Sequence, residues 1–239
     1  TDHRTAAINI LKDALMQMAA RSTFSDLEHT VPSILRDAIQ DYSNLLDSAG
    51  SKALRRNPGE PWRQFINLIV VKLDNTLEDD FENLAPRSYY ASVDELQKDI
   101  DIIKESMLCS SMSRIVGELL FPIERKIQCF GFHLATLDIR QNSAFHEKAV
   151  EQLLKAASVS DWEYSSWSET KRMEFLNREL LSNRPFAVSD MAIGPEADQL
   201  ISCYRVVRDH VKKYGSSGIG SFIVSMTREV SDLLVVYLF

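Results

Sequence analysis

The sequence contains few residues that interrupt helices and few that cross-link chains. Its 239 residues include only eight glycines and seven prolines, which disfavours a sandwich or barrel of short strands joined by many tight turns. The three cysteines, Cys109, Cys129 and Cys203, are an odd number whose spacings match neither a disulfide framework nor a common zinc site. We therefore expect a mainly α protein whose thiols are reduced and mostly buried.

Long apolar runs and an excess of positive charge are also missing. No segment approaches the roughly 18 apolar residues of a membrane span, and the first residues carry interspersed charges at helical spacing, unlike a secretion signal. The formal net charge of −7 opposes binding to a phosphate backbone, which needs clustered lysine and arginine. We expect a cytoplasmic protein that binds neither membranes nor nucleic acid.

Apolar residues recurring at intervals of three and four predict helices along most of the chain. The expected helices cover about 8–18, 34–46, 65–77, 92–107, 111–128, 144–157, 168–182 and 195–213. Ser92 followed three residues later by Glu95 is typical of a capped helix start, and Pro122 predicts a bend around residues 118–122.

Two segments, 133–140 and 221–227, have the pattern of β-strands. Alternation along the first places Asp138 and Arg140 on one face. Because both strands fall in the second half, we divide the chain into a helical bundle, residues 1–128, and a mixed region, residues 129–239.

Familiar catalytic and metal-binding motifs do not match. The glycines of GSSGIGS, residues 215–221, lack the spacing of a phosphate loop or a nucleophile elbow. His146 and Glu147 are followed by Val150 where a zinc protease has its second histidine, so a packing role is favoured for His146. We predict no metal ligands and no catalytic residue within the chain.

Arg140 ends an otherwise strand-like run, and the residues alone leave two interpretations open. The favoured one is a structural ion pair with Asp138 or with a neighbouring helix, because an arginine near a core is normally compensated. The other is a ligand contact, because a planar guanidinium at the end of a parallel strand suits phosphate or carboxylate. Gln141 is a second candidate for contact with the ligand.

Three segments in the second half resemble the phosphoenolpyruvate carboxylase family. FGFHLATLDIRQNSAFHEKAV (130–150) is similar to the segment in which a strand ending in D-I-R-Q precedes a helix bearing histidine. WSETKRMEFLNRELLSNRP (167–185) and IGSFIVSMTREVSDLLVVYL (219–238) resemble two further segments in the same order. The match departs at MTREVSD, where the family usually has M-A-x-x-P-S-D.

The resemblance implies a helix-rich fragment of an embellished (β/α)₈ barrel. It implies a cytoplasmic carboxy-lyase, usually a homotetramer, that joins phosphoenolpyruvate and bicarbonate to give oxaloacetate and phosphate with Mg²⁺ or Mn²⁺. This reaction fixes carbon dioxide and replenishes the tricarboxylic acid cycle. The resemblance also assigns Arg140 to the phosphate of phosphoenolpyruvate.

Much of the machinery that the resemblance implies would lie outside this sequence. The family's T-A-H-P-T histidine motif would precede residue 1, and its metal-binding acids, lysine and F-H-G-R-G-G loop would follow residue 239. Together with the apolar end LLVVYLF, this predicts an inactive fragment that binds no metal and self-associates. The alternative is a stand-alone helical interaction or regulatory domain of the same ancestry without catalysis.

Overall fold

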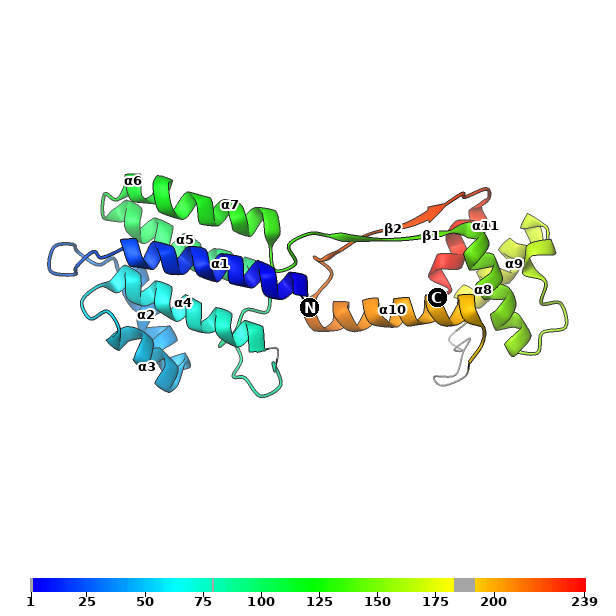
Figure 1. Cartoon of the computed structure of the whole chain (residues 1–239), viewed down its shortest axis with the longest axis horizontal. Coiled ribbons are helices and arrows are strands. Elements are labelled where there is room, and N and C mark those ends of the chain that lie inside the picture. The colour runs from blue at the N-terminus through cyan, green and yellow to red at the C-terminus, as the bar shows by residue number, and fades with distance from the viewer. Residues whose placement is uncertain (1, 79, 183–191) are drawn as a thin grey trace. The chain divides into compact units, whose positions relative to one another are not determined.

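The computed structural model describes residues 2–78, 80–182 and 192–239, and helices make up most of this part of the chain. The helices are α1 (Asp2–Arg21), α2 (Ser33–Leu45), α3 (Asp47–Arg55), α4 (Pro61–Glu78), α5 (Val93–Cys109), α6 (Ser113–Ile115), α7 (Phe121–Phe130), α8 (Ser143–Ala156), α9 (Glu169–Leu180), α10 (Pro195–Tyr214) and α11 (Val230–Leu234). The strands are β1 (Leu137–Asn142) and β2 (Ile219–Ser225), and shorter turns are η1 (Val116–Leu120), η2 (Tyr164–Ser166) and η3 (Val235–Tyr237). The prediction of a mainly α protein with about two strands is confirmed (Figure 1).

The chain divides into two compact units, unit 1 (Thr1–Ala135) and unit 2 (Thr136–Phe239). Unit 1 contains α1 to α7, and unit 2 contains both strands together with α8 to α11. The division follows Ala135, whereas the boundary expected from the sequence follows residue 128. The turn that connects α7 to β1 lies between these two positions.

The core of unit 1 lies between the apolar faces of its long helices. α4 contacts α1, α2 and α3, and α1 also contacts α7 (Figure 1). The fully buried side chains include Ile8, Leu11 and Leu15 of α1, Phe65, Ile66 and Ile69 of α4, and Ile100 and Ile103 of α5. Burying each large apolar side chain stabilises the fold by about 1.5–3 kcal/mol. Packing of these faces therefore holds the helices more than intrinsic propensity does.

A polar cluster lies inside this core. The carboxylate of Asp99 is almost fully buried and accepts hydrogen bonds from the hydroxyls of Tyr42, at 2.7 Å, and Tyr90, at 2.5 Å. Lys72 Nζ donates to Tyr42 at 2.9 Å and lies 3.5 Å from Asp99 Oδ2. Because the charges are paired and hydrogen-bonded, the cluster can be buried, and it joins α2, α4 and α5.

Two helix starts in unit 1 differ from the sequence-based expectation. The helix expected to end at residue 46 is followed at once by α3, and the break is at Asp47, which has a left-handed φ of 46°. Ser92 occupies the position before α5, but its side chain makes no capping bond. Instead, Glu95 Oε2 accepts from the backbone N–H of Ala91 at 2.9 Å.

The bend expected around residues 118–122 is a π-helical turn, η1, which lies directly before α7. Pro122 has no N–H to donate to the carbonyl four residues earlier, and its ring crowds that carbonyl. The hydrogen-bond ladder widens just before the proline, as in other π-bulges. Pro122 then lies in the first turn of α7, where the missing donor costs little.

Unit 2 contains a two-stranded sheet in which β1 and β2 run parallel. The chain between the strands passes through α8, α9 and α10, the kind of crossover that parallel strands require. α8 is central to the unit, because it contacts α10, η2, η3, α11 and β1. Its apolar residues enter two core clusters, one with Val150 and Leu154 and the other with Ala149 and Leu153.

The predicted bounds of both strands were wrong by a few residues. The first strand was expected over 133–140, but β1 begins only at Leu137 because the preceding residues turn and Leu134 has a left-handed φ of 66°. The second was expected over 221–227, but β2 ends before Met226, whose φ is 58°. A strand needs extended backbone, so it cannot include either residue.

Candidate functional site

Arg140 lies near the end of β1, and its guanidinium pairs with the carboxylate of Asp138. Nη2 donates to Asp138 Oδ2 at 3.3 Å, and 70% of the Arg140 side-chain surface is exposed. The pair uses one of the five N–H donors of the guanidinium. An ion pair this open to water contributes little to folding stability. The ion pair expected from the sequence is therefore present, but it leaves most of the arginine accessible.

Arg140 projects from the sheet face that lies away from α10. On the other face, the ring of Phe222 stacks on Tyr204 of α10, with centroids 5.4 Å apart and planes at 10°. Ile139 pairs with Phe222 in the register of the sheet, and side chains alternate between the two faces along a strand. Arg140, which pairs with Ile223, consequently points to the side that α10 does not cover.

Asp138 stands at an irregularity of the sheet. The register shifts there, so that Gly220 and Ser221 of β2 lie opposite this single residue of β1. Asp138 Oδ1 accepts from the backbone N–H of Ser221 at 3.0 Å. This bond, together with the guanidinium of Arg140, holds the pKa of Asp138 below its usual range, so the carboxyl is charged at neutral pH. A Cβ at Gly220 would lie 2.4 Å from Asp138 Oδ1, so glycine leaves the space that the carboxylate needs.

The end of β1 leads directly into α8. Asn142 caps this helix, because its Oδ1 accepts from the backbone N–H of Phe145 at 2.7 Å. Ser143 Oγ donates to the carbonyl of Met226 at 2.8 Å and ties the ends of the two strands together. Gln141 Oε1 accepts from the N–H of Asn142 at 2.9 Å, and alternation places Gln141 on the face opposite Arg140. The structure therefore does not bring Gln141 and Arg140 together.

A charged network that sequence reasoning missed lies beyond the end of β2. Glu147 of α8 is buried, and its Oε1 accepts from Arg172 Nη1 and from Arg228 Nη2, each at 2.7 Å. Arg228 also donates to Asp232 Oδ1 at 3.1 Å. Burial by itself raises the pKa of Asp232, but hydrogen bonds from Arg228 and from the N–H of Glu229 outweigh it and lower this pKa.

The network gives a shape to MTREVSD, the segment in which the sequence departs from the family pattern. Arg228 is the third residue of this segment, and it donates both to Asp232, the last residue of the segment, and to Glu147 of α8. The departure from the family pattern does not identify this network, because Arg228 stands at a position where the pattern allows any residue. Its partner on α8 could not be identified from spacing, because Glu147 is remote in sequence.

His146 is buried in the first turn of α8. Its Nδ1 lies 3.0 Å from the carbonyl oxygen of Asn142, which can only accept, so Nδ1 carries the proton. Burial lowers the pKa of His146 below its usual value and outweighs the hydrogen bond to Asn142 and the nearby Asp232. These contacts favour the packing role that the sequence suggested.

No group of three or more histidine, cysteine, aspartate and glutamate side chains among residues 2–78, 80–182 and 192–239 could hold a metal ion, so the described residues do not fit a divalent cation. No helix in the same part of the chain is long and apolar enough to cross a membrane. The cysteines are free, but Cys109 and Cys129 are exposed and Cys203 is half-buried, so the expectation of mostly buried thiols was wrong.

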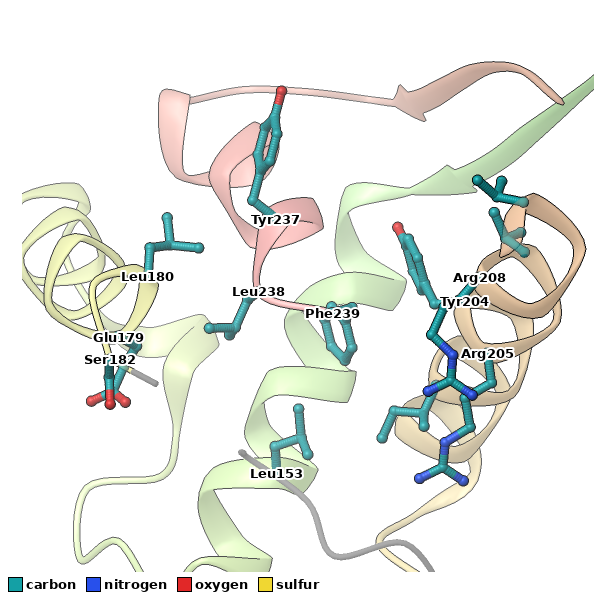
Figure 2. Close-up of a pocket in the computed structure, with 13 residues that line it drawn as sticks. Leu153, Glu179, Leu180, Ser182, Tyr204, Arg205, Arg208, Tyr237, Leu238 and Phe239 are labelled. Carbon is teal, nitrogen blue, oxygen red and sulfur yellow. The ribbon is translucent and has the colours of Figure 1, made fainter. Parts of the chain in front are cut away.

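A pocket of about 710 Å³ lies elsewhere in unit 2, between α8, α9, α10 and the last residues of the chain (Figure 2). Figure 2 shows Phe239 between Leu238 and Tyr204, and the rings of Phe239 and Tyr204 are stacked with centroids 6.2 Å apart. Two arginines of α10, Arg205 and Arg208, also line it. The lining does not include Asp138, Arg140 or Gln141, so the pocket is separate from the strand-end site.

Comparison with known proteins relates this arrangement to one family. The family model for phosphoenolpyruvate carboxylase matches residues 1–239, the whole of the chain. The chain belongs to the phosphoenolpyruvate carboxylase family. The match extends to unit 1, whereas the three segments that resemble the family lie in the second half of the sequence.

Individual phosphoenolpyruvate carboxylases are similar to the chain at moderate identity. The protein of Roseiflexus castenholzii is 31% identical over 97% of this chain and 25% of its own length. The protein of Aromatoleum aromaticum is 34% identical over 73% of the chain and 20% of its own length, and one from Rhodopseudomonas palustris is 36% identical over 73% and 19%. The chain therefore spans about a quarter or less of these relatives.

Proposed function

We propose that this chain is the central part of an enzyme that carboxylates phosphoenolpyruvate with bicarbonate, giving oxaloacetate and phosphate. Membership of the carboxylase family supports the reaction class. The observation that carries the site is Arg140, an accessible guanidinium near the end of a parallel strand, on the face that α10 leaves uncovered. Ligands of parallel barrels collect at this end of the strands.

In this proposal Arg140 binds the phosphate of phosphoenolpyruvate. Phosphoenolpyruvate and bicarbonate bring several negative charges together, and a fixed guanidinium lowers their repulsion. As bicarbonate attacks phosphorus, the bond from phosphorus to the enol oxygen breaks, leaving carboxyphosphate and an enolate. Arg140 stabilises the charge on the phosphoryl oxygens in this step. The enolate carbon then captures the carbon dioxide that carboxyphosphate releases together with phosphate.

The divalent cation, Mg²⁺ or Mn²⁺, belongs in this proposal to residues outside the chain, and we assign no step to it here. We likewise propose that residues 1–239 alone do not turn over substrate, and that the complete enzyme is a cytoplasmic homotetramer. The reading frame around the chain tests this assignment. In-frame T-A-H-P-T upstream and F-H-G-R-G-G downstream support the enzyme, whereas native start and stop codons at the two ends support the stand-alone helical domain.

Replacement of Arg140 in the complete enzyme tests the phosphate contact. Arg140→Ala should raise the KM for phosphoenolpyruvate and lower kcat, with kcat/KM falling roughly 100-fold, because a charge-assisted contact to the reacting group is lost. Arg114→Ala is the matched control, since Arg114 is also exposed and paired with a single carboxylate, that of Glu118. Steady-state kinetics equal to those of the control would remove Arg140 from the site.

A further inference from the structure

Asp138 has features that a simple surface ion pair does not require. Its two carboxylate oxygens have separate partners, because Oδ1 accepts from the N–H of Ser221 and Oδ2 accepts from Arg140. The first partner is backbone, so the carboxylate is anchored to β2 although it belongs to β1. The second partner is the long side chain that the proposed function assigns to substrate.

The backbone around Asp138 is shaped for this arrangement. β2 inserts an extra residue at this point, which directs the N–H of Ser221 to the carboxylate. Gly220 has no side chain, and any Cβ there would lie 2.4 Å from Oδ1 and displace the carboxylate. Bulge, glycine and hydrogen bond all lead to one result, a carboxylate held in a defined place on the uncovered face of the sheet.

An arginine that binds a substrate must lose its rotational freedom. Arg140 is 70% exposed, and within the described part of the chain Asp138 is the one side chain that accepts a hydrogen bond from it. A free exposed arginine samples many rotamers, and fixing it on binding costs conformational entropy. A carboxylate that is itself fixed can hold one edge of the guanidinium and leave its other donors for phosphate.

We propose that Asp138 is a positioning residue that orients the guanidinium of Arg140 for the phosphate group of the substrate, and that Gly220 provides the space for it. This inference rests on the proposed function. Asp138 also has an opposing effect on binding, because its negative charge repels the phosphate group. Positioning and repulsion predict opposite changes in the KM for phosphoenolpyruvate when that charge is removed, so kinetics decides between them.

The test compares Asp138→Asn, Gly220→Ala and Arg140→Gln in the complete enzyme. Asparagine keeps an oxygen that can accept from Ser221 but cannot hold the guanidinium as a carboxylate does. We expect kcat/KM to fall about tenfold with most of the change in KM, the size expected for one charge-assisted hydrogen bond. Gly220→Ala should have the same effect by displacing the carboxylate. The double variant Asp138→Asn/Arg140→Gln should be no worse than Arg140→Gln, because Asp138 acts through Arg140.

Asp161→Asn is the matched control, since Asp161 is also an exposed aspartate that pairs with a cation, Lys171. The kinetics of this variant enzyme should be unchanged. A second measurement uses the 239-residue chain. Arg140→Gln should raise the pKa of Asp138 in a ¹³C-carboxyl NMR titration if the pair forms in solution, and an unchanged pKa contradicts the proposal.

The outcomes separate the two proposals. If Arg140→Gln impairs the enzyme but Asp138→Asn leaves or lowers the KM, the positioning role is wrong and the phosphate contact stands. If Arg140→Gln has no effect, the proposed contact fails and Asp138 has nothing to position.

Discussion

Replacement of Glu147 should cost unit 2 a large part of its folding free energy. It is buried, and it accepts two charge-assisted hydrogen bonds of 2.7 Å, from Arg172 and Arg228. In Glu147→Ala the buried Arg172 keeps its bond to the carbonyl of Ser165, at 2.8 Å, but loses its carboxylate. Removing one partner of a buried ion pair costs about 3–5 kcal/mol, because the other charge remains buried.

That cost is a large fraction of the roughly 5–15 kcal/mol by which a domain is stable. With a urea dependence of roughly 2 kcal/mol per molar, the unfolding midpoint of unit 2 should fall by roughly 2 M. Glu147→Gln should lose less, because its amide oxygen still accepts a hydrogen bond. Asp161→Ala removes an exposed carboxylate that pairs with Lys171 and accepts from the indole N–H of Trp167. It is the control and should lower the midpoint far less, because an exposed ion pair contributes little to folding stability.

The three tryptophans allow the two units to be followed separately. Trp62 lies in the core of unit 1, where its indole N–H donates to Ser106 at 3.0 Å, whereas Trp162 and Trp167 pack in unit 2. In Glu147→Ala, the indole N–H signals of Trp162 and Trp167 should disappear at a lower urea concentration than in the unsubstituted chain, whereas the Trp62 signal should not shift. Equal midpoints in the alanine variants at 147 and 161, or an equal shift of the Trp62 signal, would refute the reasoning.

Two pH-dependent effects follow from other buried groups. Burial lowers the folded-state pKa of His146, so folding favours its neutral form. The contribution of His146 to stability is fully present above about pH 6.5 and is lost as the pH falls below that value, and His146→Gln should reduce this loss in urea titrations at acid pH. Burial, together with Asp99, raises the pKa of Tyr90, so unit 1 should lose stability as the pH rises above 10. Tyr90→Phe should remove that residue's share of the alkaline loss but cost about 1–3 kcal/mol at pH 7, because Asp99 loses a buried donor; an unchanged midpoint would contradict this.

Local patterns in the sequence were enough to predict most elements. Apolar periodicity identified the long helices, because a helix that packs on one side has apolar residues at intervals of three and four positions. Pro122 was correctly expected to disturb its helix, since a missing N–H acts through the backbone nearby. The ends of elements were harder to predict. β1 begins late because Leu134 adopts a left-handed φ, which a leucine rarely does. The break between α2 and α3 lies at Asp47, which also has a left-handed φ; aspartate adopts this conformation more often, but most aspartates do not.

The sequence by itself determined the family, because three segments resemble it in the same order, and it placed Asp138 and Arg140 on one face of a strand, because side chains alternate along a strand. It left open whether Arg140 pairs with Asp138 or with a helix. Only the tertiary structure decided which face of the sheet carries Arg140, that Ser221 and Gly220 hold the carboxylate beside it, and that Glu147 binds Arg228. These contacts join residues roughly eighty positions apart. No periodicity within one segment encodes such a contact, because it depends on how the crossover returns β2 to the side of β1.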